Sequence, residues 1–126
     1  SKALAVPGDA RESMRRGVRA FVEYLVSHAD YFRVDLREGR SWAIGDVEAS
    51  PAFQSGIESW TDLMRRGVAE GLFHDEDASV MAVTAFGVMQ IQLAAWLAKP
   101  KPPTTETIAE RIAIHLERAF CRDGGG

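Results

Sequence analysis

The stretch from Ala78 to Ala98, ASVMAVTAFGVMQIQLAAWLA, contains no charged residue. A helix that is apolar on all sides has to be covered on all sides. Two interpretations compete. The segment is long enough to cross a bilayer, which takes about 20 apolar residues. Alternatively, it is the central helix of a water-soluble domain, with one face in its own core and the other against a second subunit.

Polar residues within the segment favour the water-soluble interpretation. Ser79, Thr84, Gln90 and Gln92 interrupt the apolar run, and amide side chains are costly in hydrocarbon. No aromatic belt or basic flank frames the segment, as is typical of a membrane span. We therefore expect a soluble domain with no membrane partner.

The remaining long segments predict amphipathic helices. Apolar residues recur at three- and four-residue steps over 9–29, over 51–71 and after Thr104, which is the helical period. A shorter helix is expected over Asp30–Glu38. No segment alternates with a period of two, so the predicted fold is all-α, a bundle of about five helices.

Capping residues predict where these helices begin and end. Gly71 follows the second long segment, where glycine commonly ends a helix. The sequence HDED then offers Asp75 or Asp77 as the N-cap of the uncharged helix, and Thr104 suits the N-cap of the last helix. The prolines of KPKPP separate these two helices, since proline cannot continue helical hydrogen bonding.

Length and composition limit the organisation and the partners. The chain has 126 residues, which suits one domain over 1–126. Its net charge is −3, so there is no electrostatic reason to expect nucleic acid binding by this chain. Cys121 is the single cysteine, and a lone thiol fits a reducing cytoplasm.

Aromatic residues on and between the helices suggest a ligand pocket. The segment from His28 to Ala43, HADYFRVDLREGRSWA, places aromatic residues among charges, and we interpret it as the mouth of a hydrophobic pocket between the long helices. Bulky, unevenly shaped side chains leave gaps, and pockets are mostly apolar with a few polar groups. For each residue alone, plain core packing is the competing interpretation. The candidate ligand-binding residues are Phe21, Tyr24, His28, Phe32, Trp42, Phe53, Trp60, Met64, Phe86 and Gln90.

The uncharged helix also predicts a homodimer. A domain this small offers too few helices to cover the whole circumference of that helix. Two helices from each of two subunits could form a four-helix contact, and two-fold symmetry is the commonest arrangement. The candidate interface residues are Val80, Thr84, Ile91, Ala95, Ile112, Leu116 and Phe120.

Catalytic chemistry has no support in the sequence. The three histidines His28, His74 and His115 lack metal-ligand spacing. No nucleophile motif and no phosphate-binding glycine loop occurs. We expect no enzyme activity, no catalytic residue, no metal and no cofactor.

The order of elements resembles the tetracycline-repressor (TetR) family of bacterial regulators. The resemblance rests on LMRRGVAEGLFHDEDASVMAVTAFGVMQIQLAAWL, on HADYFRVDLREG and on TTETIAERIAIHLERAF. In such proteins the C-terminal domain binds a small effector and dimerises through its last two long helices. The resemblance thus implies the effector-binding and dimerisation domain of a cytoplasmic repressor with a small hydrophobic effector. DNA would be bound only through an N-terminal helix-turn-helix domain, which we expect to be absent from this chain.

A second hypothesis remains open from the residues themselves. The chain could be a helical protein–protein interaction module with a solid core and no small-molecule ligand. It would share the helical fold and the uncovered apolar helix, but its aromatic residues would only fill the core.

Overall fold

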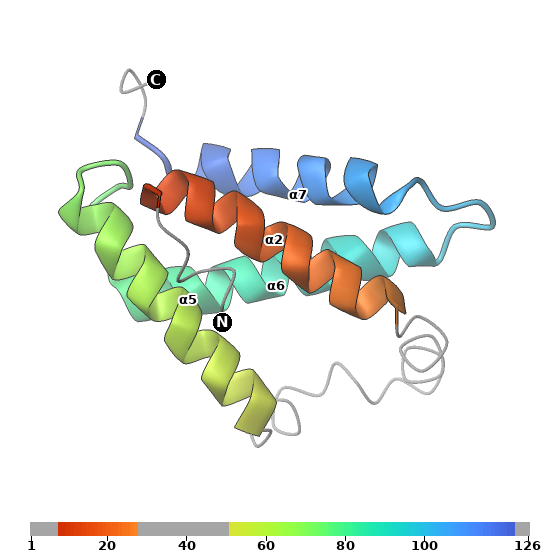
Figure 1. The fold of residues 1–126 in the computed structure, drawn as a ribbon, viewed down its shortest axis with the longest axis horizontal. Coiled ribbons are helices and arrows are strands. Elements are labelled where there is room, and N and C mark those ends of the chain that lie inside the picture. Colours follow the sequence, from red (N-terminus) through yellow and green to blue (C-terminus); the bar gives the residue numbers. More distant parts are fainter. Residues whose placement is uncertain (1–7, 28–50, 123–126) are drawn as a thin grey trace.

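The computed structural model describes residues 8–27 and 51–122, and these residues form four helices (Figure 1). The helices are α2 (Ala10–Ser27), α5 (Pro51–Ala69), α6 (Ala78–Leu97) and α7 (Thr105–Phe120). The described part of the chain contains no strand, so the all-α prediction is confirmed. The count is one below the expected five, and the short helix expected over Asp30–Glu38 lies outside the described residues.

The helix boundaries follow from the capping residues. Asp77, rather than Asp75, is the N-cap of α6, since its Oδ1 accepts hydrogen bonds from the backbone N–H groups of Ser79 and Val80 at 2.9 and 3.3 Å. Thr104 caps α7 by accepting from the Thr107 N–H at 3.1 Å. Both side chains satisfy amide donors that have no partner within the helix.

Gly71 ends the second long helix as expected. Its φ of 76° lies in the left-handed region that favours glycine. The chain then turns back, and the Leu72 N–H donates to the carbonyl of Gly67 at 3.0 Å. This turn directs the chain towards α6.

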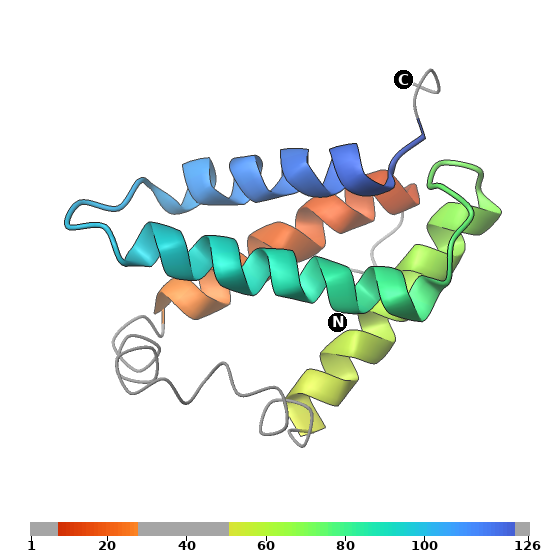
Figure 2. The same ribbon diagram turned by 180° about the vertical axis from the view of Figure 1, so that it is seen from behind.

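Helix α6 lies behind α2 in Figure 1, and α7 runs beside both helices. Figure 2 shows α6 and α7 side by side from behind, joined by the proline-containing loop. α5 crosses α6 at one end, and its most extensive contacts are with α6, while those of α2 are with α7. α6 is therefore the helix on which α5 and α7 both pack.

The core between the helices is rich in methionine. All four methionines of the chain, Met14, Met64, Met81 and Met89, are buried with at most 1% of their surface exposed. Methionine has three rotatable side-chain bonds and fills irregular gaps. These four side chains can change shape more easily than the branched side chains that surround them in the core.

The loop after α5 is tied to the end of α7. The His74 N–H donates to the Phe120 carbonyl at 2.8 Å, and the Arg122 N–H donates to the Leu72 carbonyl at 2.9 Å. An isolated β-bridge pairs Phe73 with Cys121. At this end of the bundle, the start of α2, the end of α5 and the end of α7 lie together (Figures 1 and 2).

Candidate functional site

Three helices contribute to an aromatic cluster formed by Phe21, Trp60 and Phe86. The Phe86 ring of α6 lies edge-on to Phe21 of α2, with ring centroids 5.7 Å apart, and edge-on to Trp60 of α5 at 6.3 Å. Edge-to-face pairs at these distances are favourable beyond the apolar area that they bury. The structure thus brings together three of the predicted pocket residues.

A glycine on α5 allows this close approach of α5 and α6. A Cβ atom at Gly56 would lie 2.8 Å from Cζ of Phe86, which is far below an ordinary van der Waals contact. A larger residue would therefore require α5 or the Phe86 ring to shift.

The other predicted pocket residues are dispersed. Met64 is fully buried, Gln90 is partly exposed, and Tyr24 is 61% exposed. Phe53 lies on α5, but its side chain is outside the described part. His28, Phe32 and Trp42 lie outside the described residues, as does the whole predicted pocket mouth from His28 to Ala43.

A groove of about 240 Å³ lies between α2 and α7, away from the aromatic cluster. It is lined by Arg15, Arg16, Arg19, Ala109, Glu110 and Ala113. Four of the six lining residues are charged, and none of the predicted pocket residues lines this groove. The groove therefore does not correspond to the predicted pocket.

The outer face of α6 is apolar and uncovered. Val80 is 61% exposed, Val83 is 55% exposed and Ile91 is 62% exposed. Thr84 and Ala95 are exposed on the same helix, so four of the predicted interface residues lie at the surface. The opposite side of α6 packs into the core through Met81, Ala82, Ala85, Phe86, Met89, Leu93 and Leu97.

The three predicted interface residues on α7 lie elsewhere. Ile112, Leu116 and Phe120 are 0%, 0% and 3% exposed, and they belong to the core of this protomer. The apolar stripe of α7 covers its own neighbouring helices, leaving exposed residues such as Arg111 and Arg118 on the outside. The helical period identifies an apolar stripe but does not say whether its partner is the same chain or a second one.

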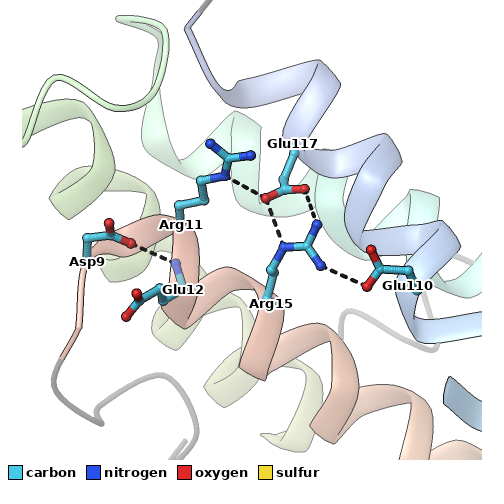
Figure 3. Close-up of polar contacts among 6 residues, drawn as sticks. All are labelled: Asp9, Arg11, Glu12, Arg15, Glu110 and Glu117. Carbon is cyan, nitrogen blue, oxygen red and sulfur yellow. Dashed lines mark hydrogen bonds and ion pairs between the residues drawn. The ribbon is translucent and has the colours of Figure 1, made fainter. Parts of the chain in front are cut away.

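Glu117 forms a polar connection between α7 and α2 that the sequence analysis did not identify (Figure 3). The Glu117 carboxylate accepts hydrogen bonds from Arg11 Nε at 2.7 Å, from Arg15 Nε at 3.0 Å and from Arg15 NH2 at 2.5 Å. Arg15 also donates to Glu110 at 2.8 Å. The spacing of Glu110 and Glu117, seven residues apart on one face of α7, was the available sequence indication.

Burial and hydrogen bonding act in opposite directions on Glu117. Burial disfavours its charged form, but hydrogen bonds from Arg15 and then from Arg11 outweigh this, so the pKa of Glu117 is lowered. Hydrogen bonds from Glu117 and Glu110 raise the pKa of Arg15. Both groups are therefore ionised at neutral pH, and the contact is structural rather than a proton-transfer site.

Neither a metal cluster nor a second apolar span occurs in the described ranges. Within residues 8–27 and 51–122, no group of three His, Cys, Asp or Glu residues could hold a metal ion. In the same ranges, α6 is the one helix long and apolar enough to cross a membrane by length and composition.

Comparison with known protein families matches residues 7–119 to the family described as Tetracyclin repressor-like, C-terminal domain. No match was found among curated proteins or among solved structures. The family match spans nearly the whole chain, and the four-helix arrangement is consistent with it. The chain therefore belongs to the family of tetracycline-repressor-like C-terminal domains, as the sequence resemblance indicated.

Proposed function

We propose that this chain is the effector-binding and dimerisation domain of a cytoplasmic TetR-like transcriptional repressor. Domains of this family are generally parts of regulators rather than of enzymes. They typically dimerise and bind small-molecule effectors. DNA binding belongs to a separate N-terminal domain in this proposal. The observation that carries it is α6, which is core on one face and apolar but uncovered on the other.

The proposed dimer places a second copy on the outer face of α6. Val80, Val83 and Ile91 expose more than half of their surfaces there, and no residue of α6 is charged. Because this face is apolar and uncharged, a two-fold axis can pair it with its own copy without desolvating a charge. In this proposal the partner does not contact the apolar stripe of α7, which is formed by Ile112, Leu116 and Phe120. These residues instead pack α7 into the core of its own protomer.

The dimer is tested by sedimentation of the purified chain at micromolar concentration. Ile91→Asp places a charge in the middle of the proposed interface, and we expect it to convert dimer to monomer. Glu58→Gln, an exposed position on α5, is the matched control and should leave the dimer unchanged. A wild-type chain that sediments as a monomer contradicts the proposal.

The proposed effector is a small hydrophobic molecule held by the aromatic cluster of Phe21, Trp60 and Phe86. Trp60 and Phe86 are only 4% and 8% exposed, so an effector reaches them only when α2, α5 and α6 move apart. The four buried methionines can adapt to such a movement, because their side chains are flexible. A ligand that binds the opened arrangement better shifts the population towards it, and only this difference in affinity can change the separation of the DNA-reading domains.

A panel of lipophilic compounds tests the effector proposal through the melting temperature of the chain. A ligand that binds only the folded state raises this temperature. Phe86→Ala should abolish the increase for any compound that binds at the cluster, whereas Glu23→Ala, at an exposed position on α2, should retain it. If no compound in a broad panel raises the melting temperature, the effector proposal fails.

The close packing of the cluster favours one alternative function, a helical interaction module with a solid core. Met64, another predicted pocket residue, is fully buried, as expected of plain core packing. The module would dimerise or bind another protein through the α6 face and would bind no lipophilic compound. A dimer with no ligand response would support this alternative.

A further inference from the structure

A row of arginines follows one side of α2. Arg11, Arg15 and Arg19 recur every four residues, and residues four apart are neighbours on a helix surface. The first two bind a carboxylate of α7, since Arg11 and Arg15 both donate to Glu117 (Figure 3). Arg15 also donates to the Glu110 carboxylate at 2.8 Å. This side of α2 therefore already binds carboxylates in the folded chain.

The third arginine of the row has no such partner. Arg19 is exposed, and it forms no ion pair with any residue of 8–27 or 51–122. It lines the groove of about 240 Å³ between α2 and α7, together with Arg15 and Arg16. The one carboxylate in this lining belongs to Glu110, which is bonded to Arg15. α7 therefore leaves Arg19 without an acceptor.

Two alanines of α7 give the groove an apolar floor. Ala109 and Ala113 belong to its lining and are 5% and 2% exposed. Because alanine has no atom beyond Cβ, space remains between α7 and the arginines of α2. The groove thus combines an apolar surface with guanidinium groups, as a site for an organic anion requires.

The charges around the groove leave one positive charge without a counterpart. Arg16 has Glu12 at 4.0 Å, and Arg11 and Arg15 have the carboxylates of α7. The groove and its ion-pair partners comprise four arginines and three glutamates, namely Arg11, Arg15, Arg16, Arg19, Glu12, Glu110 and Glu117. A ligand with a single negative charge would balance this set.

We propose that the groove binds a small organic carboxylate, with its anionic group on Arg19 and Arg16 and its apolar part on Ala109 and Ala113. The planar fork of a guanidinium matches the two oxygens of a carboxylate. The volume of about 240 Å³ is below the roughly 300–1,000 Å³ of sites for drug-sized ligands, so the ligand has only a few carbon atoms. The groove shares no residue with the aromatic cluster, and this second site goes beyond the proposed effector binding there.

Butyrate is the probe, and an NMR titration of the purified chain follows the backbone amide shifts of Ala109 and Ala113. Butyramide has nearly the same shape without the charge, and we expect it to bind about fivefold more weakly, as for a partly exposed ion pair. Acetate lacks two CH₂ groups, so it should bind about threefold more weakly than butyrate in a half-open groove. Inorganic phosphate, which has charge but no apolar part, should also bind more weakly than butyrate.

Arg19→Gln tests the position of the carboxylate. We expect it to weaken butyrate binding about fivefold, because the unpaired guanidinium is removed. Arg65→Gln is the matched control, since Arg65 lies on α5 outside the groove lining and its side chain is 67% exposed. It makes the same change in net charge and should alter the affinity less than about twofold. Both arginines are exposed, so neither variant disturbs the core.

Glu110→Gln tests the competition with the carboxylate already present in the groove. It frees Arg15 from Glu110 and should tighten butyrate binding about threefold. Glu58→Gln, at an exposed position on α5, makes the same change in net charge away from the groove. It should alter the affinity less than about twofold.

The proposal is overturned if butyrate gives no saturable shift at Ala109 and Ala113. It is also overturned if Arg19→Gln and Arg65→Gln weaken binding equally, because the attraction would then come from net charge alone. Phosphate binding as tight as that of butyrate would show a general anion site and contradict the assignment to an organic carboxylate. None of these outcomes bears on the aromatic cluster, whose test is the response of the melting temperature to lipophilic compounds.

Discussion

Replacement of Glu117 by Gln tests how strongly the polar contact between α2 and α7 stabilises the fold. Glu117 is 8% exposed, and its two carboxylate oxygens accept three hydrogen bonds from Arg11 and Arg15. A glutamine keeps the shape but offers one acceptor oxygen, and it turns an NH₂ group towards a guanidinium. At least one charge-assisted hydrogen bond is lost in a nearly buried site.

The expected loss in free energy of unfolding is about 1.5–3 kcal/mol, the value of a hydrogen bond to a charged group. It is not larger, because the side chains of Arg11 and Arg15 are 47% and 38% exposed and water takes over part of their solvation. Glu110→Gln is the matched control. Glu110 pairs with the same Arg15 but is 55% exposed, so its replacement should cost about 1 kcal/mol or less.

Urea unfolding of wild type and both variants at one protein concentration measures these differences, since dimerisation would make stability depend on concentration. Equal losses for Glu117→Gln and Glu110→Gln would refute the reasoning that burial of Glu117 sets the strength of the contact. In that case the contact of Arg15 with Glu117 would stabilise the fold no more than its contact with the exposed Glu110.

The same contact predicts a pH dependence. The pKa of Glu117 in the folded chain is lowered from 4.5, so the unfolded chain binds this proton at a higher pH than the folded chain. The stabilisation is therefore complete above the unfolded pKa and is lost as the pH falls through the lower, folded pKa. Urea midpoints measured from pH 6 down to acid conditions should fall less steeply for Glu117→Gln than for wild type.

Three substitutions test the packing and the capping of the helices. Gly67→Ala would place a Cβ 2.1 Å from Cδ2 of the buried Phe73 ring, so we expect a loss of about 1–3 kcal/mol in urea unfolding; an unchanged midpoint would contradict this contact. Asp77→Ala removes the N-cap of α6 and should cost about 0.5–2 kcal/mol, whereas Asp75→Ala, at an exposed position, should stay within about 0.5 kcal/mol. Trp60→Ala should cost about 3–5 kcal/mol by the same measurement because its ring is 4% exposed; a clearly smaller loss would indicate open space beside the ring.

Local chemistry in the sequence determined the helices and their ends. Asp77 and Thr104 accept hydrogen bonds from the first amides of α6 and α7 whatever the rest of the chain does, and Gly71 can adopt a positive φ without strain. The uncharged α6 likewise required cover on every side, and Val80 and Ile91 still lack it within the protomer. The caps and the turn could be predicted because each depends on neighbours within a few residues, and the lack of charge on α6 can be read directly from its sequence.

Only the tertiary structure decided which surfaces meet. The stripe of Ile112, Leu116 and Phe120 is equally apolar whether it faces its own core or a partner, and the packing of α7 on α2 and α6 placed it inside. Glu117 would be expected in solvent as a charged helix residue, yet Arg11 and Arg15 of a helix about 100 residues earlier cover it. The helical period identifies which residues share a face, but contacts between distant segments depend on how whole helices pack, which no local pattern contains.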